Sequence, residues 1–562
     1  MSDSGILDRN LVALSTRQPD LVSRLSGSKP DENLSFIESR IGLPVPILPR
    51  DGRPFPMHSR FDPILEGQKL ADGSPVGYLV AFGLGGGYHL KPLLEKKTLT
   101  GLIIVEQSLP LVRALLERID LTRLLSDSRV ILLIDPLPGE LTRVILERYL
   151  PVLYGNLGSI TLRSRWDSDP SWFGNLADSL KGIPEALGRD YTVQARFGRR
   201  WLVHTMANLP RSEVVGAVLP PSRRLLITAA GPSLEEQLSK VRSLQSGGAA
   251  LLATDTSLPL LASAGLVPDM VLSIDCQVVS YHHFLNGLPK KTLLILDLAS
   301  PPALTRLTDR TLFFSSGHPF SLYLNRLYRP FPILDISGGN VTHAAASLAQ
   351  AAGAEEVHLF GADFSYPMGR PYAKETYIFP YFQSRSDRIS SSENLFWKFI
   401  ADSRPRREKT GDSWRFRTSS MDHYREALEG AIGDMSFRLI QESGAGVPIE
   451  PPATADASKA VRDRRVFPML TAGPVTVGWK DFLQDYRRRL KNLPSLSGPP
   501  QDYLEELEPE NRQAWATLLP SAATFRSESP DGPAAVEKAR QWTLGRIDNL
   551  RRIYSDPQIT AP

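Results

Sequence analysis

Short apolar runs alternate with helix-like segments from residue 223 onward, and this alternation restricts the fold more than any other feature of the sequence. Each run is short and apolar enough for a buried strand, and helical segments follow most of them. Strands that alternate with helices form a parallel sheet with helices on both faces. We therefore predict an α/β fold with a Rossmann-like parallel sheet, its strands at residues 225–228, 250–254, 270–274, 292–296, 312–314 and 357–360.

A similar alternation occurs earlier in the chain. A strand-like run at 77–84 leads into a glycine-rich turn at 83–89, and further runs follow at 101–106 and 130–135. The second run ends in Glu106, where nucleotide-binding Rossmann halves bond a ribose. The glycines would equally allow a helix to pack closely on its strand, so a ligand site and a ligand-free sheet both remain open. In either case we predict two Rossmann-like sheets in tandem.

The chain of 562 residues is too long for one hydrophobic core, so we expect several domains. Two prolines at 220–221 mark a boundary, two more at 451–452 begin a linker, and amphipathic helices follow the linker. We predict an N-terminal Rossmann-like domain with a helical lead-in, a central α/β domain that carries the catalytic site, and a helical C-terminal domain, at residues 1–215, 216–450 and 451–562.

Composition excludes several classes of protein. A net charge of +4 is small for this length and does not indicate nucleic-acid binding. Cys276 is the single cysteine, so there is no intramolecular disulfide and no multi-cysteine metal site, and a reducing compartment fits. No apolar stretch approaches 18 residues, and no signal peptide is visible. We expect a cytoplasmic protein without a membrane span.

The turn after the strand at 225–228 has the composition of an anion site. Ala229, Ala230 and Gly231 are small, so a ligand can approach the backbone, and Pro232 suits the first turn of a helix. Ser233 adds a hydroxyl beside the free N–H groups of that helix, where phosphate binds readily. An ordinary strand-to-helix turn has the same composition, so both interpretations stay open here.

Carboxylates follow several strands of the second predicted sheet. Asp255, Asp275, Asp297 and Asp363 stand at or just after strand ends, and ligands of open α/β sheets bind at that edge. One such residue would be read as a helix cap or turn residue, whereas four at one edge favour a site. A carboxylate there could deprotonate an acceptor hydroxyl or hold a divalent metal, so Mg²⁺ is the one cofactor we consider.

Two further segments could complete that edge. Gly338, Gly339 and Asn340 open an alanine-rich helix and could cradle a second anionic or sugar group. Tyr372 lies in an aromatic and basic loop that could cover a sugar or base, or could pack against another domain. No zinc-protease motif, P-loop, nucleophile elbow or cysteine nucleophile occurs, so these turns and carboxylates suit a nucleotide-activated donor.

Five segments together resemble one known family. Residues 229–234, 253–261, 268–275, 338–341 and 360–363 are similar to the motility-associated factor (Maf) flagellin glycosyltransferases, whose shared domain is also similar to archaeal 6-hydroxymethylpterin pyrophosphokinase. Residues 58–63 and 83–89 look like the Maf amino-terminal domain. The resemblance covers most of residues 1–450.

The resemblance implies a transferase that moves a nonulosonic (sialic-like) acid from its CMP form to Ser or Thr of flagellin. The partners implied are CMP-activated nonulosonic acid and flagellin, with no nucleic acid. Related sialyltransferases carry Asn where this chain has Ala230, so donor contacts would depend on the backbone and Ser233. His343 is an alternative to His318 as the catalytic histidine. The catalytic residues implied are Asp275, Asp363 and His318, and the donor-binding residues are Ala230, Gly231, Pro232, Ser233, Asp255, Gly338, Gly339, Asn340 and Tyr372.

Two other functions remain open. The first is a diphosphotransferase on a pterin alcohol, with ATP and with Mg²⁺ held by Asp255, Asp275 or Asp363. The second is a flagellar assembly factor whose sheet has lost catalysis.

Overall fold

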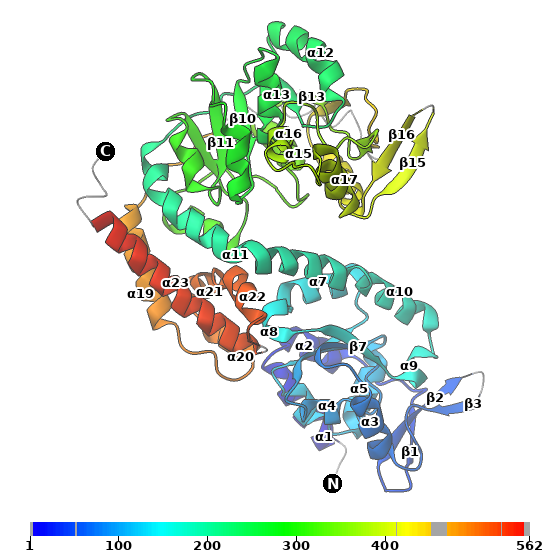
Figure 1. Cartoon of the computed structure of the whole chain (residues 1–562). Helices are drawn as coiled ribbons and strands as arrows, with labels where there is room; N and C mark the ends of the chain where they lie inside the picture. Colours follow the sequence, from blue (N-terminus) through cyan, green and yellow to red (C-terminus); the bar gives the residue numbers. More distant parts are fainter. Residues whose placement is uncertain (1–3, 51–52, 412, 451–468, 530, 556–562) are drawn as a thin grey trace. The chain divides into compact units, whose positions relative to one another are not determined.

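The computed structural model describes residues 4–50, 53–411, 413–450, 469–529 and 531–555 (Figure 1). The chain divides into two compact units. The first comprises Met1–Gly198, Leu493–Arg512 and Leu518–Gln541, and the second comprises Arg199–Asn492, Gln513–Thr517 and Trp542–Pro562. The predicted three-domain division stays a prediction, and the linker predicted at 451–452 lies outside the described residues.

The first unit contains a four-stranded parallel sheet with the order β6-β5-β4-β7. The three strands predicted there are confirmed to within two residues, whereas β7 was not predicted because its sequence, LGSIT, is short and only partly apolar. Chain order reverses at β4, since β5 and β6 lie on one side of it and β7 on the other. The strands are β4 (Gly77–Phe82), β5 (Leu99–Glu106), β6 (Val130–Ile134) and β7 (Leu157–Thr161).

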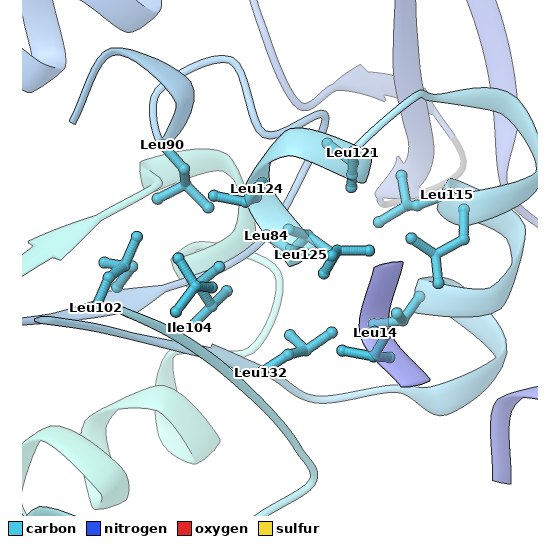
Figure 2. Close-up of a cluster of buried hydrophobic side chains, with 14 of the residues drawn as sticks. Leu14, Leu84, Leu90, Leu102, Ile104, Leu115, Leu121, Leu124, Leu125 and Leu132 are labelled. Atoms are coloured by element: carbon cyan, nitrogen blue, oxygen red, sulfur yellow. The ribbon is translucent and has the colours of Figure 1, made fainter. Parts of the chain in front are cut away.

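Leucine side chains fill the core between this sheet and its helices. Leu102 and Ile104 of β5 and Leu132 of β6 face Leu14 and the helical leucines (Figure 2). A small antiparallel sheet accompanies the predicted helical lead-in: β1 (Ser35–Glu38), β2 (Pro44–Arg50) and β3 (Arg53–Pro56). The helices are α1 (Ser4–Ser15), α2 (Pro19–Gly27), α3 (Pro63–Asp72), α4 (Lys91–Leu94), α5 (Leu109–Arg118), α6 (Thr122–Leu125), α7 (Pro138–Arg148), α8 (Pro151–Tyr154), α9 (Arg163–Trp166), α10 (Pro170–Leu180) and α11 (Ile183–Val214), the last continuing into the second unit.

The second unit contains a seven-stranded parallel sheet with the order β12-β11-β10-β9-β8-β13-β17. All six predicted strands are present, and β17 adds a seventh at the edge. The predicted fold class, two tandem parallel sheets and a helical C-terminal region, is confirmed. The strands are β8 (Arg224–Thr228), β9 (Ala250–Thr254), β10 (Met270–Ser273), β11 (Leu293–Asp297), β12 (Thr311–Phe314), β13 (Glu356–Phe360) and β17 (Arg438–Gln441).

Helices and a small sheet surround this larger sheet. The small antiparallel sheet has the order β14-β16-β15 and comprises β14 (Tyr366–Pro367), β15 (Arg406–Thr410) and β16 (Ser413–Arg417). The helices are α12 (Leu234–Ser246), α13 (Leu258–Ser263), α14 (Pro319–Leu327), α15 (Val341–Ala351), α16 (Ile378–Gln383), α17 (Ser392–Ala401) and α18 (Ser419–Ile432), with 3₁₀ turns η1 (Asp255–Ser257), η2 (Val278–Phe284) and η3 (Pro302–Arg306). The C-terminal helices are α19 (Trp479–Asn492), α20 (Pro500–Glu506), α21 (Pro509–Ala516), α22 (Leu519–Arg526) and α23 (Gly532–Ser555).

Strand order identifies where a ligand of the larger sheet is expected. From β8 the chain adds β9 to β12 on one side and then returns to place β13 on the other side. Ligands of open α/β sheets bind outside the carboxyl ends of the strands at such a reversal. The turn after β8 and the acidic loop after β13 meet there. Among the helices of the described residues, none is long and apolar enough to cross a membrane.

Candidate functional site

The turn after β8 is bonded to the loop after β13. The Gly231 N–H donates to the Gly361 carbonyl at 2.8 Å, and the Ser233 N–H donates to Asp363 Oδ2 at 3.0 Å. Burial raises the pKa of Asp363, although hydrogen bonds from Ser233 oppose this rise. The Asp363 carboxylate therefore occupies the position beside the start of α12 where an external anion was expected. The phosphate-binding role of residues 230–233 stays a prediction.

Internal packing accounts for the small residues of this turn. A Cβ atom on Gly231 would lie 2.4 Å from Asp363 Oδ2 and 2.5 Å from the Gly361 carbonyl oxygen. A Cβ atom on Gly444 would lie 2.4 Å from Ser233 Oγ, which also accepts a hydrogen bond from the Ala445 N–H at 3.0 Å. Glycine is thus required at 231 and 444 because three chain segments pass one another closely.

Asp255 and Asp275 form the acidic part of the edge. Asp255 follows β9 and accepts a hydrogen bond from the Ser273 hydroxyl at 2.6 Å. Asp275 follows β10 and accepts one from the Gln277 N–H at 2.9 Å. Burial raises the pKa of Asp275, and the negative charge of Asp255 raises it further. The sequence prediction brought these two residues together because adjacent parallel strands end at the same edge.

Tyrosines of the aromatic loop interact electrostatically with these carboxylates. Burial raises the pKa of Tyr372 and of Tyr377, and the charge of Asp255 adds to both shifts. Asp275 adds to the shift of Tyr377. The loop therefore lies beside the acidic edge, and both interpretations of its role stay predictions.

His283 is a member of this cluster that sequence reasoning missed. It lies on η2, immediately after β10, and is 8% exposed. Within the described part of the chain its Nδ1 atom has no hydrogen-bond partner, and its ring meets the Tyr377 ring edge-on at 4.6 Å. The charge of His283 lowers the pKa of Asp275, so the two groups interact. The only sequence signal was a pair of histidines shortly after a strand that ends in an acidic residue.

The second glycine turn approaches the same cluster. A Cβ atom on Gly339 would lie 3.1 Å from Tyr424 Cε1, and the Tyr424 side chain contributes to the raised pKa of Tyr372. Asn340 caps α15, since its Oδ1 accepts from the His343 N–H at 3.0 Å. Gly338 packs on the His343 ring, because a Cβ atom there would lie 2.3 Å from Nδ1. Residues 338–340 and Tyr372 therefore belong to one neighbourhood.

The two histidines considered from the sequence have other surroundings. His343 is buried, and its Nε2 lies 3.0 Å from Oδ2 of the exposed Asp335, so it belongs to a separate pair. His318 begins α14 after the edge strand β12, two strands away from β10, and its ring stacks on Trp201 at 3.9 Å. Burial lowers the pKa of His318 to about 4. Its catalytic assignment stays a prediction.

Asp297, at the end of β11, provides a pH-dependent test of this edge. It is 2% exposed, and burial raises its pKa from 3.8 to about 6. Between pH 7 and pH 5 the folded protein therefore takes up a proton that the unfolded chain does not. The free energy of unfolding rises as the pH falls through this range, and the gain is lost as the pH rises through 6. We expect Asp297→Asn to remove about 1 kcal/mol of this pH-dependent gain. Urea unfolding of the wild-type protein and of the variant at pH 5 and pH 7 would check this. If the free energy of unfolding changed equally between the two pH values in both proteins, the prediction would be wrong.

The glycine-rich turn of the first unit is filled by the protein's own side chains. The Leu84 N–H donates to Glu106 Oε2 at 3.0 Å, and Arg165 pairs with Glu106 at 2.5 Å. Both charged side chains are buried. The Gly86 N–H donates to His58 Nε2 at 3.0 Å. The carboxylate predicted to bond a ribose is thus engaged internally, which favours the ligand-free interpretation of this sheet.

Two family models match the chain. Residues 57–156 match the Maf glycosyltransferase N-terminal domain, and residues 202–369 match the 6-hydroxymethylpterin diphosphokinase MptE-like family. The first match supports glycosyltransferase activity.

Individual proteins are similar over different shares of the chain. One uncharacterized protein of Treponema pallidum (strain Nichols) is 29% identical over 29% of this chain and 79% of its own length. A second from the same organism is 30% identical over 30% of this chain and 62% of its own length. The solved structure of the MAf glycosyltransferase from Magnetospirillum magneticum AMB-1 is 15% identical, has a TM-score of 0.59 and covers 100% of this chain and 98% of that chain. The chain thus combines a Maf glycosyltransferase N-terminal domain and an MptE-like domain within the fold of a Maf glycosyltransferase, which confirms the resemblance seen in the sequence.

Proposed function

We propose that this protein transfers a nonulosonic acid from its CMP-activated form to Ser or Thr hydroxyls of flagellin, in the cytoplasm. The family match of residues 57–156 supports a glycosyltransferase. The observation that carries the proposed site is the cluster of Asp255, Asp275 and His283 beside Tyr372 and Tyr377, at the carboxyl ends of β9 and β10.

His283 has the role of general base in this proposal. The acceptor oxygen attacks the anomeric carbon, the bond from that carbon to the phosphate oxygen breaks, and CMP leaves with the electron pair. The acceptor proton passes to His283 Nδ1, the atom without an internal partner. The Asp275 carboxylate stabilises the imidazolium that forms, because opposite charges attract strongly where water is excluded. The donor is held by residues 338–340 and Tyr372: Gly339 lies beside Tyr424, and Tyr424 interacts with Tyr372.

The turn at 230–233 can bind the donor phosphate only if the Asp363 carboxylate is displaced or neutralised. Asp363→Asn keeps an oxygen for the Ser233 N–H and removes the negative charge. We expect this variant to bind CMP up to about tenfold more tightly, since removal of a like charge favours a phosphate there. Titration calorimetry with CMP would check this, and an unchanged Kd would place the phosphate elsewhere.

The intact mass of flagellin tests the proposed function as a whole. Flagellin from cells that lack this protein is expected to lose the mass of its nonulosonic acid residues, and expression of the protein should restore that mass. Unchanged flagellin mass in its absence would overturn the proposal.

A second candidate function follows from the family of residues 202–369, whose model is named for 6-hydroxymethylpterin diphosphokinase. Asp255 and Asp275 fit a Mg²⁺ that arrives with the phosphates of ATP, since Mg²⁺ at such sites uses one or two carboxylates plus substrate oxygens. Among the described residues there is no group of three His, Cys, Asp or Glu side chains arranged for a metal alone. Calorimetry separates the candidates: heat with ATP and Mg²⁺ but none with CMP would favour the diphosphotransferase.

A further inference from the structure

The small sheet β14-β16-β15 ends in an open edge. β15 pairs with β16 on one side only, and four of its five residues are exposed. Figure 1 shows β15 and β16 together at the periphery of the second unit. An open edge strand presents a row of backbone N–H and C=O groups to which another strand can add.

One face of this hairpin is cationic and aromatic. Arg407 stands opposite Phe416 and Lys409 opposite Trp414, so the four side chains share a face. The Arg407 guanidinium lies 4.9 Å from the centre of the Trp414 ring. From α17, Trp397 reaches within 5.6 Å of the Phe416 ring and is still 54% exposed.

The other face is electrically neutralised. Arg406 pairs with Asp422 of α18 at 3.0 Å, and Arg415 pairs with Glu408 at 2.7 Å. By contrast, Arg407 and Lys409 form no ion pair within the described residues. Among the described residues of the hairpin, the uncompensated positive charge therefore lies on its aromatic face.

We propose that this edge and face dock an extended acidic segment of the acceptor polypeptide, which adds to β15 as a fourth strand. The inference rests on the proposed function, because it assumes a polypeptide acceptor. Arg407 and Lys409 complement carboxylates, the β15 backbone supplies the ladder of hydrogen bonds, and Trp397 supplies an apolar anchor.

The helix that carries Trp397 also reaches the candidate site. Phe399, on the side of α17 roughly opposite Trp397, has its ring 6.3 Å from that of Tyr372. Tyr372 interacts in turn with Asp255. A polypeptide held at β15 is thus tethered beside the acidic cluster. A single-stranded nucleic acid would stack its bases on several open rings in a row, whereas Arg407 covers the Trp414 ring of this face.

Fluorescence anisotropy of the full chain with a labelled peptide tests this inference. The probe is an extended peptide of about ten residues that alternates Asp and Val, long enough to span the strand. We expect the double variant Arg407→Glu/Lys409→Glu to weaken its binding at least about tenfold. The control is the double variant Lys290→Glu/Lys291→Glu, which makes the same charge change just before β11 of the larger sheet, outside the small sheet that carries β15. It should bind the probe normally.

Two further probes separate strand addition from simple charge attraction. The same peptide with alternate backbone nitrogens methylated keeps its charge but cannot donate a ladder of hydrogen bonds, and it should bind at least about tenfold more weakly. The proposal would be overturned if the methylated peptide bound as tightly as the unmethylated one, or if the two double variants bound the peptide equally. It would also be overturned if an oligothymidine bound more tightly than the peptide. Because the peptide is measured without donor, a protein that binds it but transfers no sugar would count against the proposed function alone.

Discussion

Replacement of His283 with Gln is expected to lower kcat for sugar transfer by about two to four orders of magnitude, the usual contribution of a general base. His283 Nδ1 lies buried in the acidic cluster and has no hydrogen-bond partner among the residues that the structure describes. Because Gln cannot take the acceptor proton, only the chemical step should suffer. Binding of CMP, measured by calorimetry, should change by less than about twofold, since the base contacts the acceptor rather than the nucleotide.

The neighbouring histidine provides the matched control. His282 lies on the same 3₁₀ turn and its ring contacts Tyr377 and Tyr381, so His282→Gln changes the same kind of side chain in the same aromatic cluster. It should retain most of the activity. His318→Gln tests the residue that the sequence suggested. If His318→Gln abolished transfer and His283→Gln did not, the base would lie beyond β11 at the sheet edge, and the mechanism proposed here would be wrong.

Most strands of both sheets could be predicted because they are runs of apolar residues of strand length. The pairing of Asp255 with Asp275 followed from the same pattern, since neighbouring parallel strands end at one edge. β7 was not predicted, because this edge strand is short and only partly apolar.

The site details that could not be predicted depend on contacts between distant segments. The Asp363 carboxylate reaches the Ser233 N–H across 130 positions of sequence. The role of His283 depends on the loop that brings Tyr377 over it, 94 positions later. No local pattern specifies such contacts, because they are set by how loops pack after the sheet has formed.

The two sheets use the same device with different electrostatics. In each, a backbone N–H after the first strand donates a hydrogen bond to a carboxylate at the end of a neighbouring strand: Leu84 to Glu106, and Ser233 to Asp363. Buried Arg165 neutralises Glu106, whereas burial raises the pKa of Asp363. A carboxylate that is costly to keep charged is the easier one for a ligand to displace or protonate, so the second sheet is the better candidate for a working site.

The second large effect is expected from Gly231→Ala, which should destabilise the second unit by about 3 kcal/mol. The new methyl group would lie 2.5 Å from the Gly361 carbonyl oxygen, a backbone atom held by its own hydrogen bond from the Gly231 N–H. It would also lie 2.4 Å from Asp363 Oδ2. Neither neighbour can move without breaking the hydrogen bonds that join the turn after β8 to the loop after β13, so the overlap must be relieved by separation of these two segments.

Hydrogen exchange of the α12 amides, together with urea unfolding of the second unit, would measure this effect. Gly430→Ala is the matched control, because Gly430 lies inside α18 and a Cβ atom there meets nothing within 4 Å. That substitution should stabilise the protein by up to about 1 kcal/mol, the ordinary helix-propensity gain. If Gly231→Ala also proved neutral or stabilising, the close passage of the two loops would not exist in solution. The small residues after β8 would then have to be explained by a ligand rather than by packing.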